Sequence, residues 1–346
     1  MRLAPPDAAL LARGAPFLRL LSEAAAELGG RVEFEQEFGY LGRYFAPDGR
    51  MRPIFGKSLG LNRDSAAAIA ADKDYTARLL ATCGLPTPAG FVVFSAGYSN
   101  RMALRNRDVA EKLAGRRTAL ERAAQLGFPL IVKPNSGSEG FGVSLVANGT
   151  EVAADLDALL ATEDRVRIEM FAPGCDVRVL VLDRRAVLAY ERRGLTLAGD
   201  GNTSIARLLA QRLGSLASHH RGTKISADDP RIARRLGRLG LTRDTVPAAG
   251  QRIEILDNAN LSTGGEMRDV TLSLSPAARG MALRAAETLG LTVAGVDLRI
   301  AEPVRNGGGI TILEVNSAPG LDYYASAGPA QWKRAREIVV AMLDRD

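Results

Sequence analysis

Two apolar segments near the end of the chain, residues 294–300 and 310–315, constrain the fold more than any other feature. Each has the length and composition of a buried β-strand. The connection between them contains the glycine-rich run 305–309 and is too short for the crossover helix that parallel strands require. The two strands are therefore expected to pair in an antiparallel hairpin. This pairing favours an α+β fold over a doubly wound α/β domain.

The 346 residues provide enough chain for two or three lobes. We expect an N-terminal lobe over residues 1–85, a second lobe with a glycine-rich loop over 86–175, and a third lobe over 176–346. Hydrophobic periodicity predicts helices at 1–25, 65–82, 107–126, 152–160, 204–213 and 276–289. Short apolar runs predict strands at 91–94, 129–133, 143–146, 166–171 and 252–256, and a hairpin of 176–182 with 186–191.

The charge of the chain is carried almost entirely by arginine. Lysine and arginine together number 45 against 39 acidic residues, and a tally of the printed sequence finds only six lysines. The basic residues alternate with acidic ones, and aromatic residues make up only 5%, which argues against a nucleic-acid-binding protein. No apolar run approaches the ~20 residues of a membrane span. We therefore expect a soluble cytoplasmic protein that binds neither nucleic acid nor membrane.

Cysteine and histidine are too rare for most metal sites. The chain has two separate cysteines and two histidines, His219 and His220, in an arginine-rich polar stretch. These histidines are expected to be exposed rather than to act as an acid–base pair. A divalent metal would then be held by oxygen ligands, which points to magnesium.

The strongest local signal is Lys133 followed by a glycine-rich loop. Residues 128–143 read FPLIVKPNSGSEGFGV, a buried strand that ends at the lysine, with Gly137, Gly140 and Gly142 in the loop. Glycines let backbone N–H groups approach phosphate oxygens, and the lysine adds a fixed positive charge. The loop is not a Walker motif, because no Gly-Lys-Ser/Thr opens a helix. The alternative is a surface hairpin whose lysine only reaches solvent.

Three further polar residues lie within the two constraining strands. Asp297 lies in the first, and Glu314 and Asn316 occupy alternate positions in the second, so that these two share one face. Antiparallel pairing could bring Asp297 to the same face. Two carboxylates and an amide oxygen suit one or two Mg²⁺ ions that bridge nucleotide phosphates. The alternative is that Asp297 pairs with a nearby arginine and that Glu314 lies at a sheet edge.

A third segment, 168–178, ends a strand at Glu169, turns at Pro173-Gly174 and resumes after Asp176. Such a hinge can offer backbone groups to a planar base and a carboxylate to ribose hydroxyls. By itself, the segment is better interpreted as a plain connector.

Taken together, these segments follow the order found in the ATP-grasp superfamily. The blocks 197–209, 241–250 and 258–265, with 269–271, resemble the ATP-grasp region of the cyanophycin synthetases and of the bifunctional γ-glutamylcysteine–glutathione synthetases. The resemblance spans residues 62–325. It implies two α+β lobes that hold ATP between them, plus an N-terminal lobe. Because the chain shows neither a Mur-ligase-like half nor a glutamate–cysteine ligase half, we expect a free-standing ligase.

The resemblance also implies roles for single residues. Those assigned to ATP are Lys73, Lys133, Ser138, Gly140, Gly142, Glu169, Phe171 (through its backbone) and Asp176, and those assigned to magnesium are Asp297, Glu314 and Asn316. Arg178 matches an arginine near the carboxylate substrate and the γ-phosphate, and Arg192 or Arg193 could share that role. Many relatives carry an arginine where this chain has Gly295, which leaves the transition-state charge to Arg178, Arg193 or Arg268.

Backbone N–H groups around Ser262 and Gly264 are candidate donors to an oxyanion, and a tight turn is the alternative for this segment.

The activity that the resemblance implies is ATP-dependent ligation of a carboxylate to an amine, including γ-glutamyl or aspartyl bonds. The cofactors would be ATP and one or two Mg²⁺ ions, with Mn²⁺ able to substitute, and the partners would be small amino-acid or short-peptide substrates and a second copy in a homodimer. The alternatives are a carboxylate–thiol ligase, a phosphotransferase, and a nucleotide-binding regulator without catalysis. No histidine clearly matches the phosphorylated one that thiol ligases use. The first 60 residues are expected to shape the substrate pocket or a dimer contact.

Overall fold

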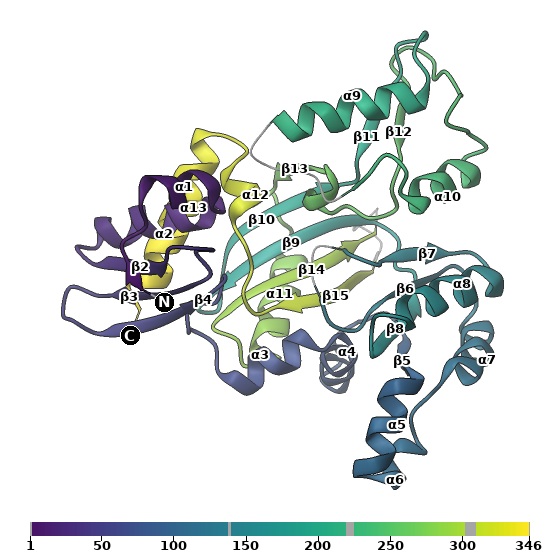
Figure 1. Ribbon diagram of the computed structural model, residues 1–346, viewed down its shortest axis with the longest axis horizontal. Helices are drawn as coiled ribbons and strands as arrows, with labels where there is room; N and C mark the ends of the chain where they lie inside the picture. The colour runs from purple at the N-terminus through teal and green to yellow at the C-terminus, as the bar shows by residue number, and fades with distance from the viewer. Residues whose placement is uncertain (1, 138–139, 219–224, 302–308, 346) are drawn as a thin grey trace.

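The computed structural model describes residues 2–137, 140–218, 225–301 and 309–345. Four sheets are present among these residues, with strand orders β1-β2-β3-β4, β5-β8-β6-β7, β13-β10-β9-β14-β15 and β11-β12. The pairings within them are antiparallel. The expected α+β class and the antiparallel pairing of the two constraining strands are therefore confirmed. Figure 1 shows the five-stranded sheet at the centre of the molecule, with the other units around it.

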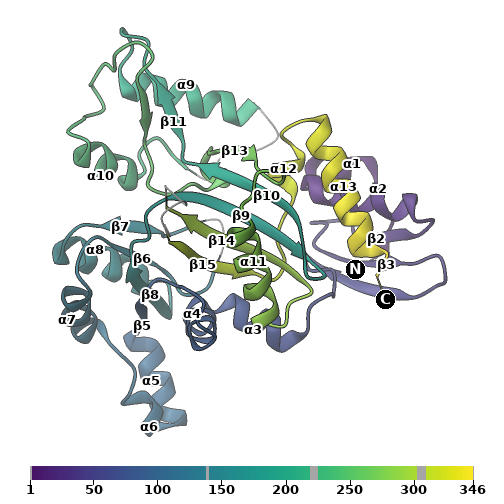
Figure 2. The same cartoon turned by 180° about the vertical axis from the view of Figure 1, so that it is seen from behind.

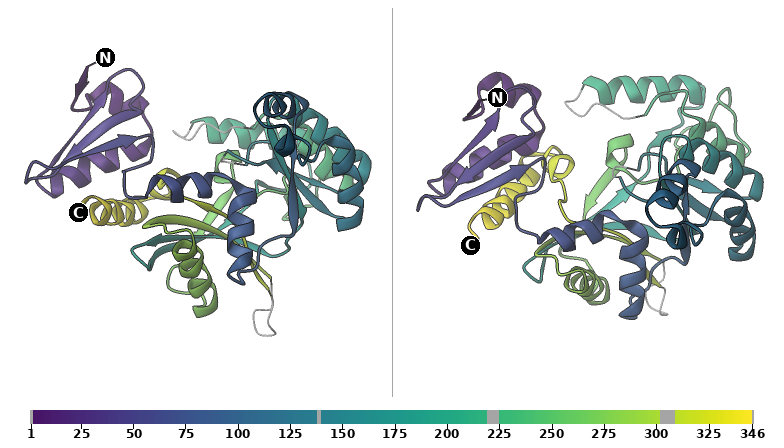
Figure 3. Two further views of the ribbon diagram at one scale, coloured as in Figure 1. Left: turned by 90° about the horizontal axis from the view of Figure 1, so that it is seen from below. Right: turned by 60° about the horizontal axis from the view of Figure 1, so that its bottom comes forward.

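The N-terminal lobe is a small sheet with helices on one face. Its elements are β1 (Leu3–Ala4), α1 (Ala8–Arg13), α2 (Pro16–Glu27), β2 (Arg31–Glu35), β3 (Leu41–Phe45) and β4 (Met51–Phe55). The predicted single N-terminal helix is two helices, because Gly14 ends α1 and Pro16 starts α2. The last helix, α13 (Pro329–Leu343), packs on α2, so the two ends of the chain share one lobe (Figures 1 and 3).

The helix predicted over 65–82 is also divided. It consists of α3 (Asp64–Ala71) and α4 (Lys73–Thr82). Asp72 separates them, since its side chain accepts hydrogen bonds from the backbone N–H groups of Asp74 and Tyr75 and caps α4. This cap places Lys73 at the first position of α4 rather than in the middle of a longer helix.

The second sheet belongs to residues 90–170. Its strands are β5 (Gly90–Phe94), β6 (Leu130–Pro134), β7 (Ser144–Val146) and β8 (Arg165–Met170), and α7 (Arg116–Leu126) and α8 (Gly149–Leu160) cover its apolar face. Where one polar helix was predicted over 107–126, α6 (Arg107–Ala110) and α7 are separate, and α5 (Ala96–Arg105) precedes them. Figure 2 shows α5 and α6 extending away from the body of the molecule.

The five-stranded sheet contains β9 (Cys175–Leu182), β10 (Arg185–Arg193), β13 (Glu266–Asp269), β14 (Val293–Ile300) and β15 (Ile310–Asn316). The predicted β9–β10 hairpin is confirmed. One face is apolar and packs on α3, α4 and α11 (Pro276–Thr288). The other face is apolar where Leu180 and Leu182 of β9, Leu188 of β10 and Val293 of β14 join the core of the N-terminal lobe. At the start of β9 that face is charged.

A small lobe between β10 and β13 has a core of its own. It contains β11 (Thr196–Ala198), α9 (Ile205–Ser218), α10 (Pro230–Arg238) and β12 (Arg252–Glu254), and it is followed by the short helical turn η1 (Leu261–Thr263). After β15, a loop leads to α12 (Asp322–Ala325). No helix in the described ranges combines the length and hydrophobicity needed to cross a membrane.

Candidate active site

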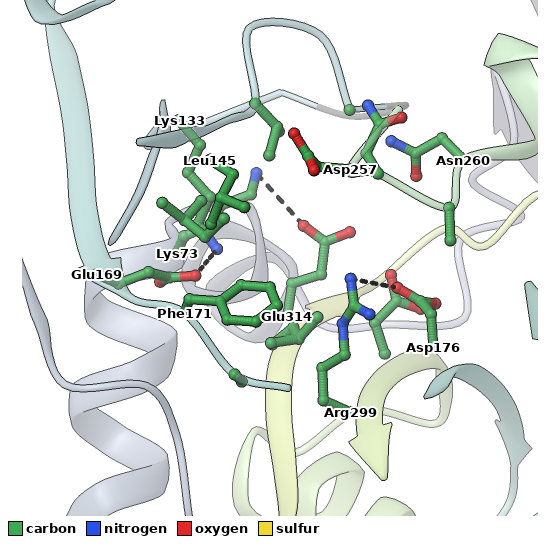
Figure 4. Close-up of a pocket in the computed structure, with 18 of the residues that line it drawn as sticks. Lys73, Lys133, Leu145, Glu169, Phe171, Asp176, Asp257, Asn260, Arg299 and Glu314 are labelled. Atoms are coloured by element: carbon green, nitrogen blue, oxygen red, sulfur yellow. Dashed lines mark hydrogen bonds and ion pairs between the residues drawn. The ribbon is translucent and has the colours of Figure 1, made fainter. Parts of the chain in front are cut away.

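The largest group of sequence-predicted residues meets in one pocket, which we call the first pocket. It lies between the second sheet and the five-stranded sheet and encloses about 910 Å³, including its open mouth. Figure 4 shows Lys73, Lys133, Glu169, Asp176 and Glu314 around it. Its other polar or charged lining residues are Ser136, Arg192, Asp257, Asn258, Asn260, Asp297 and Arg299.

Lys133 enters the first pocket from a buried strand. Its neighbours Leu130 and Val132 belong to the apolar core of the second sheet. Its Nζ lies 2.5 Å from Oε1 of Glu169, and both side chains are buried. The other oxygen of Glu169, Oε2, accepts a hydrogen bond from Nε of Arg167 at 2.7 Å. Glu169 is thus held by two cations rather than open to a ligand.

Arg167 links this carboxylate to the start of α4. Its Nη1 donates to Oδ1 of Asp74 at 2.5 Å, and its side chain is 3% exposed. Arg165, two positions earlier on the same face of β8, pairs with Asp72. The charged face of β8 therefore pairs with Asp72 and Asp74, the two carboxylates that flank Lys73. It also carries Glu169, the carboxylate that contacts Lys133.

Lys73 also lines the first pocket and lies on the same side as Lys133 (Figure 4), although the two are 60 positions apart in sequence. Its Nζ donates to the backbone carbonyl of Gly137 at 2.8 Å and lies 3.6 Å from Oε2 of Glu314. The two lysines that the sequence singled out therefore converge with the glycine-rich loop on one cavity.

The glycine-rich loop contacts the small lobe. Gly140 has a φ of +69°, and a Cβ at this position would lie 1.5 Å from Nδ2 of Asn260. Nη1 of Arg231, on α10, donates to the carbonyl of Gly140 at 3.2 Å. Gly142 does not line the pocket; a Cβ there would meet Leu159 at 2.8 Å, so this glycine serves packing. Ser138 lies outside the described residues, as do His219 and His220.

The hinge after β8 supplies an apolar end to the first pocket. Its apolar lining residues include Ile131, Leu145, Met170, Phe171 and Leu313. The backbone N–H of Phe171 donates to the carbonyl of Pro129 at 3.3 Å. A planar apolar group fits between these side chains, and a backbone contact at Phe171 would use the carbonyl.

The opposite end of the first pocket is a charged row across the five-stranded sheet. Arg178, Asp297 and Glu314 are direct partners on β9, β14 and β15 and point to the same face. Nε and Nη2 of Arg178 donate to the two oxygens of Asp297, both at 2.6 Å. Nη2 of Arg192 lies 2.9 Å from Oδ2 of the same carboxylate, and its Nε donates to Asp176 at 2.6 Å.

These contacts fix the charge states of the row. Burial alone would raise the pKa of Asp297, but the guanidinium groups of Arg178 and Arg192 outweigh it and hold this pKa well below the usual carboxyl range. Burial would lower the pKa of Arg192, but Asp176 and Asp297 raise it above the usual arginine value. Asp297, Arg178 and Arg192 are therefore ionised at neutral pH.

The donor set around Glu314 fits a magnesium ion. Asp297, Glu314 and Asn316 converge, but both oxygens of Asp297 pair with arginines, which is the alternative that the sequence left open for this residue. Nδ2 of Asn316 donates to Oε1 of Glu314 at 3.2 Å and to the carbonyl of Gly295 at 3.4 Å, which turns its Oδ1 toward other partners. The carboxylate of Glu314 and the amide of Asn316, with Asp297 behind them, match the few protein oxygens that Mg²⁺ takes beside phosphate and water. Among the described residues, no three His, Cys, Asp or Glu side chains form a metal-binding group.

The arginine expected by resemblance at Gly295 has no space here. A Cβ at Gly295 would lie 2.8 Å from Cβ of Pro319, in the loop after β15. The side chains of Arg178 and Arg192 reach Asp297 instead.

A second pocket adjoins the first and encloses about 690 Å³, including its opening. The two pockets share Arg192, Asn260 and Glu314. The remaining lining residues of the second pocket are Lys57, Arg178, Tyr190, Leu261, Ser262, Asn316, Ala318, Pro319, Gly320 and Tyr323. A molecule in the second pocket therefore meets one in the first at a charged wall.

Three predicted catalytic residues line neither pocket. Arg193 points to the opposite side of β10 from Arg192, pairs with Glu191 and is 52% exposed, and Arg268 pairs with the same carboxylate. Gly264 ends the turn η1, and its N–H donates to the carbonyl of Leu261 at 3.2 Å. Gly264 therefore belongs to a tight turn, which is the alternative that the sequence left open for this segment.

Ser262 does line the second pocket.

Strand alternation could have separated Arg192 from Arg193 in advance. Arg192 is two positions from Tyr190, which pairs with Arg178, so these three side chains share a face. Lys57 and Arg167 carried no signal in the sequence, because each acts through contacts with segments far away in the chain. Asn260 lies in the block 258–265 that carries the resemblance, but no role was assigned to it.

Comparison with known proteins agrees with this architecture. Residues 96–197 match the family model "D-ala D-ala ligase C-terminus", and residues 241–329 match the "RimK-like ATP-grasp domain". The cyanophycin synthetase of Geminocystis herdmanii is 28% identical over 350 residues, which cover 97% of this chain and 35% of that protein. The glutathione biosynthesis bifunctional protein GshAB of Streptococcus mutans is 27% identical over 275 residues, covering 75% of this chain and 34% of that protein.

A solved structure shares the fold. The bifunctional glutathione synthetase from Pasteurella multocida superposes with a TM-score of 0.56 at 20% identity, covering 94% of this chain and 44% of that one. The chain spans about a third of the length of the curated relatives it matches.

Proposed function

We propose that this chain, which has the ATP-grasp fold and resembles carboxylate–amine ligases, joins a carboxylate to an amine with hydrolysis of ATP to ADP and phosphate. The product would be a peptide or isopeptide bond, including γ-glutamyl or aspartyl bonds. The observation that carries the proposal is the shared wall of Arg192, Asn260 and Glu314 between a two-lysine pocket and a second pocket. The names of the relatives, synthetases of cyanophycin and of glutathione, support the same class of reaction.

The first pocket is assigned to ATP. The apolar end around Leu145 and Phe171 would hold the base, and Asp176, also in the pocket lining, would accept hydrogen bonds from the ribose. Lys73 and Lys133 would contact the phosphates, since a compact ammonium can reach phosphate oxygens from several directions. Glu169 fixes the Lys133 ammonium in position rather than binding the base through its carboxylate.

Magnesium would be held by Glu314 and Asn316, with Asp297 behind them. When bound, one or two Mg²⁺ ions supply positive charge to the phosphate oxygens, and Mn²⁺, with the same preference for oxygen ligands, is expected to substitute.

Two displacements complete the reaction. An oxygen of the substrate carboxylate attacks the γ-phosphorus of ATP, the bond from that phosphorus to the bridging oxygen breaks, and ADP leaves. The amine then attacks the carbonyl carbon of the acyl phosphate, loses a proton, and expels inorganic phosphate. Arg192 lies at the wall between the pockets and Arg178 lines the second pocket beside it, so both would stabilise the charge that develops there. The glycine-rich loop, held against Asn260, would exclude water from the acyl phosphate.

The decisive experiment is an ADP-release screen of amino-acid pairs, with mass spectrometry of the product. We expect ADP release that requires both a carboxylate and an amine, and a product mass equal to their sum minus water. Lys133→Ala should abolish the signal, and Lys112→Ala, which removes an exposed lysine outside both pockets, should not. ADP release without an amine-dependent product would reject the ligase and favour a phosphotransferase. The homodimer stays a prediction, for light scattering to test.

A further inference from the structure

Lys57 connects the N-terminal lobe to the second pocket. It lies in the turn after β4, within the first 60 residues, which were expected to shape the substrate pocket or a dimer contact, and its side chain lines the second pocket. It does not line the first pocket. Its Nζ lies 2.6 Å from Oδ2 of Asp322, at the start of α12, and the Lys57 side chain remains 35% exposed. The lobe thus brings a cation to the part of the second pocket beyond the shared wall.

The local backbone is shaped around this ammonium group. A Cβ at Gly320 would lie 2.4 Å from Nζ of Lys57, so glycine leaves the space that the group occupies. The other oxygen of Asp322, Oδ1, accepts a hydrogen bond from the backbone N–H of Phe17. Asp322 therefore holds Lys57 in place through one oxygen, and an ammonium group has further N–H donors for a second partner.

Attachment of the lobe does not explain the lysine. One continuous apolar core already joins the N-terminal lobe to the five-stranded sheet and to α13; its members include Phe34, Ile54, Leu180, Leu188 and Ile338. An ion pair with one half-exposed member adds little to such a contact.

The positions of the lysines also indicate a role for Lys57 in the second pocket. The chain has six lysines among 45 basic residues, and three of them, Lys57, Lys73 and Lys133, line the two joined pockets.

We propose that Lys57 binds a carboxylate of the substrate in the second pocket, other than the carboxylate that reacts, so that the chain takes a dicarboxylate such as an acidic amino acid. The proposal rests on the ligase function, because the reacting carboxylate must lie at the shared wall, next to the first pocket. Lys57 lines only the part of the second pocket away from this wall. The carboxylate that it contacts is therefore a second one, distinct from the carboxylate that reacts. The ammonium group of Lys57 attracts a negatively charged group of a substrate and repels the amine substrate.

Binding to the full chain tests this without requiring turnover. Calorimetry would be performed with Mg²⁺ and the β,γ-imido analogue of ATP, using L-aspartate, L-glutamate and the two monoamides of each as probes. The wild type should bind one acid about tenfold more tightly than one of its monoamides, the size of one charge-assisted contact. Lys57→Ala and Lys57→Gln should reduce this preference to less than about twofold, while Lys57→Arg keeps part of it.

Two controls separate binding from a purely structural role. Asp322→Asn removes the partner of Lys57 but leaves its ammonium, so the preference for the acid should persist. Lys112→Ala should behave as wild type. Wild type without preference for either acid, persistence of the preference in both Lys57→Ala and Lys57→Gln, or equal loss of it in Asp322→Asn would overturn the proposal. Failure of the ligase function looks different: the acid preference is intact, but no amine elicits ADP release.

Discussion

Lys133 and Glu169 form a buried ion pair, with Nζ 2.5 Å from Oε1, between neighbouring strands of the second sheet. Arg167 occupies the other oxygen of Glu169 and continues to Asp74, at the start of the helix that begins with Lys73. The two lysines assigned to phosphate thus depend on one strand, β8, for their positions. This arrangement has consequences for stability as well as for nucleotide binding.

Arg167→Met should be among the most destabilising substitutions in the chain. It leaves Glu169 with a single cation and takes the buried partner from Asp74, which retains only the pair with the exposed Arg78. Loss of one partner from a buried ion pair costs about 3–5 kcal/mol. Denaturant unfolding measures this, and the affinity for ATP should fall in the same variant. Arg165→Met removes a half-exposed pair with Asp72 and should cost about 1 kcal/mol or less. Equal effects of the two substitutions would contradict this interpretation.

Gly140→Ala should weaken ATP binding with little change in global stability. The added Cβ would collide with Nδ2 of Asn260, and the φ of +69° disfavours alanine, so the loop must move away from the small lobe. We expect the Kd for ATP to rise about tenfold, measured by calorimetry, which corresponds to about 1.4 kcal/mol. Gly149→Ala, at the start of α8 with nothing near its Cβ, serves as the matched control.

Arg192→Met should lower ligase activity about 100-fold or more, as loss of a charge-stabilising donor does. Arg193→Met should stay within about twofold of wild type, because Arg193 lies on the other face of β10 and pairs only at the surface. The two variants remove the same group at adjacent positions and differ only in the face of the strand. Steady-state ADP release distinguishes the two variants. Comparable losses of activity in both would contradict the charge-stabilising role of Arg192.

The charged row should make the folded chain sensitive to acid. Burial raises and the two arginines lower the pKa of Asp297, and the net pKa lies below its unfolded value of about 3.9. A depressed carboxyl pKa stabilises the fold above the unfolded pKa, and this stabilisation is lost as the pH falls further. The midpoint temperature of thermal unfolding should therefore stay constant near neutral pH and decrease below about pH 4. Asp297→Asn should lower the midpoint at pH 7 and flatten its acid dependence; an unchanged acid profile would exclude Asp297 as a source.

Glu314→Gln should raise the Mg²⁺ concentration needed for tight nucleotide binding. One of two carboxylates near the expected ion loses its charge, and we expect the half-saturating Mg²⁺ concentration to increase about tenfold. Calorimetric titration of ATP at several Mg²⁺ concentrations gives this value without turnover. Chelation of divalent cations from the wild type should weaken ATP binding further than this substitution does.

The parts of the fold that follow local rules could be read from the sequence. The β14–β15 hairpin followed from its short connection, and the convergence of Asp297 with Glu314 followed from alternation and antiparallel pairing. The break between α3 and α4 was missed, because a single side chain, Asp72, competes with the backbone there. Arg167 and Lys57 were missed because Asp74, a partner of Arg167, and Asp322, the partner of Lys57, are distant from them in sequence. Such pairings depend on tertiary structure, which periodicity does not encode.

The alternation along β8 couples correct folding to nucleotide recognition. Val166 and Ile168 face the apolar core, while Arg165, Arg167 and Glu169 face the other way. A shift of this strand by one residue would send the three charged side chains into the core and the two apolar ones toward the pocket. In a molecule with this strand out of register, Lys73 and Lys133 would therefore not both be held in their ordered positions. Retention of refolded protein on an immobilised ATP analogue should then serve as a direct assay of strand register, independent of any knowledge of the substrates.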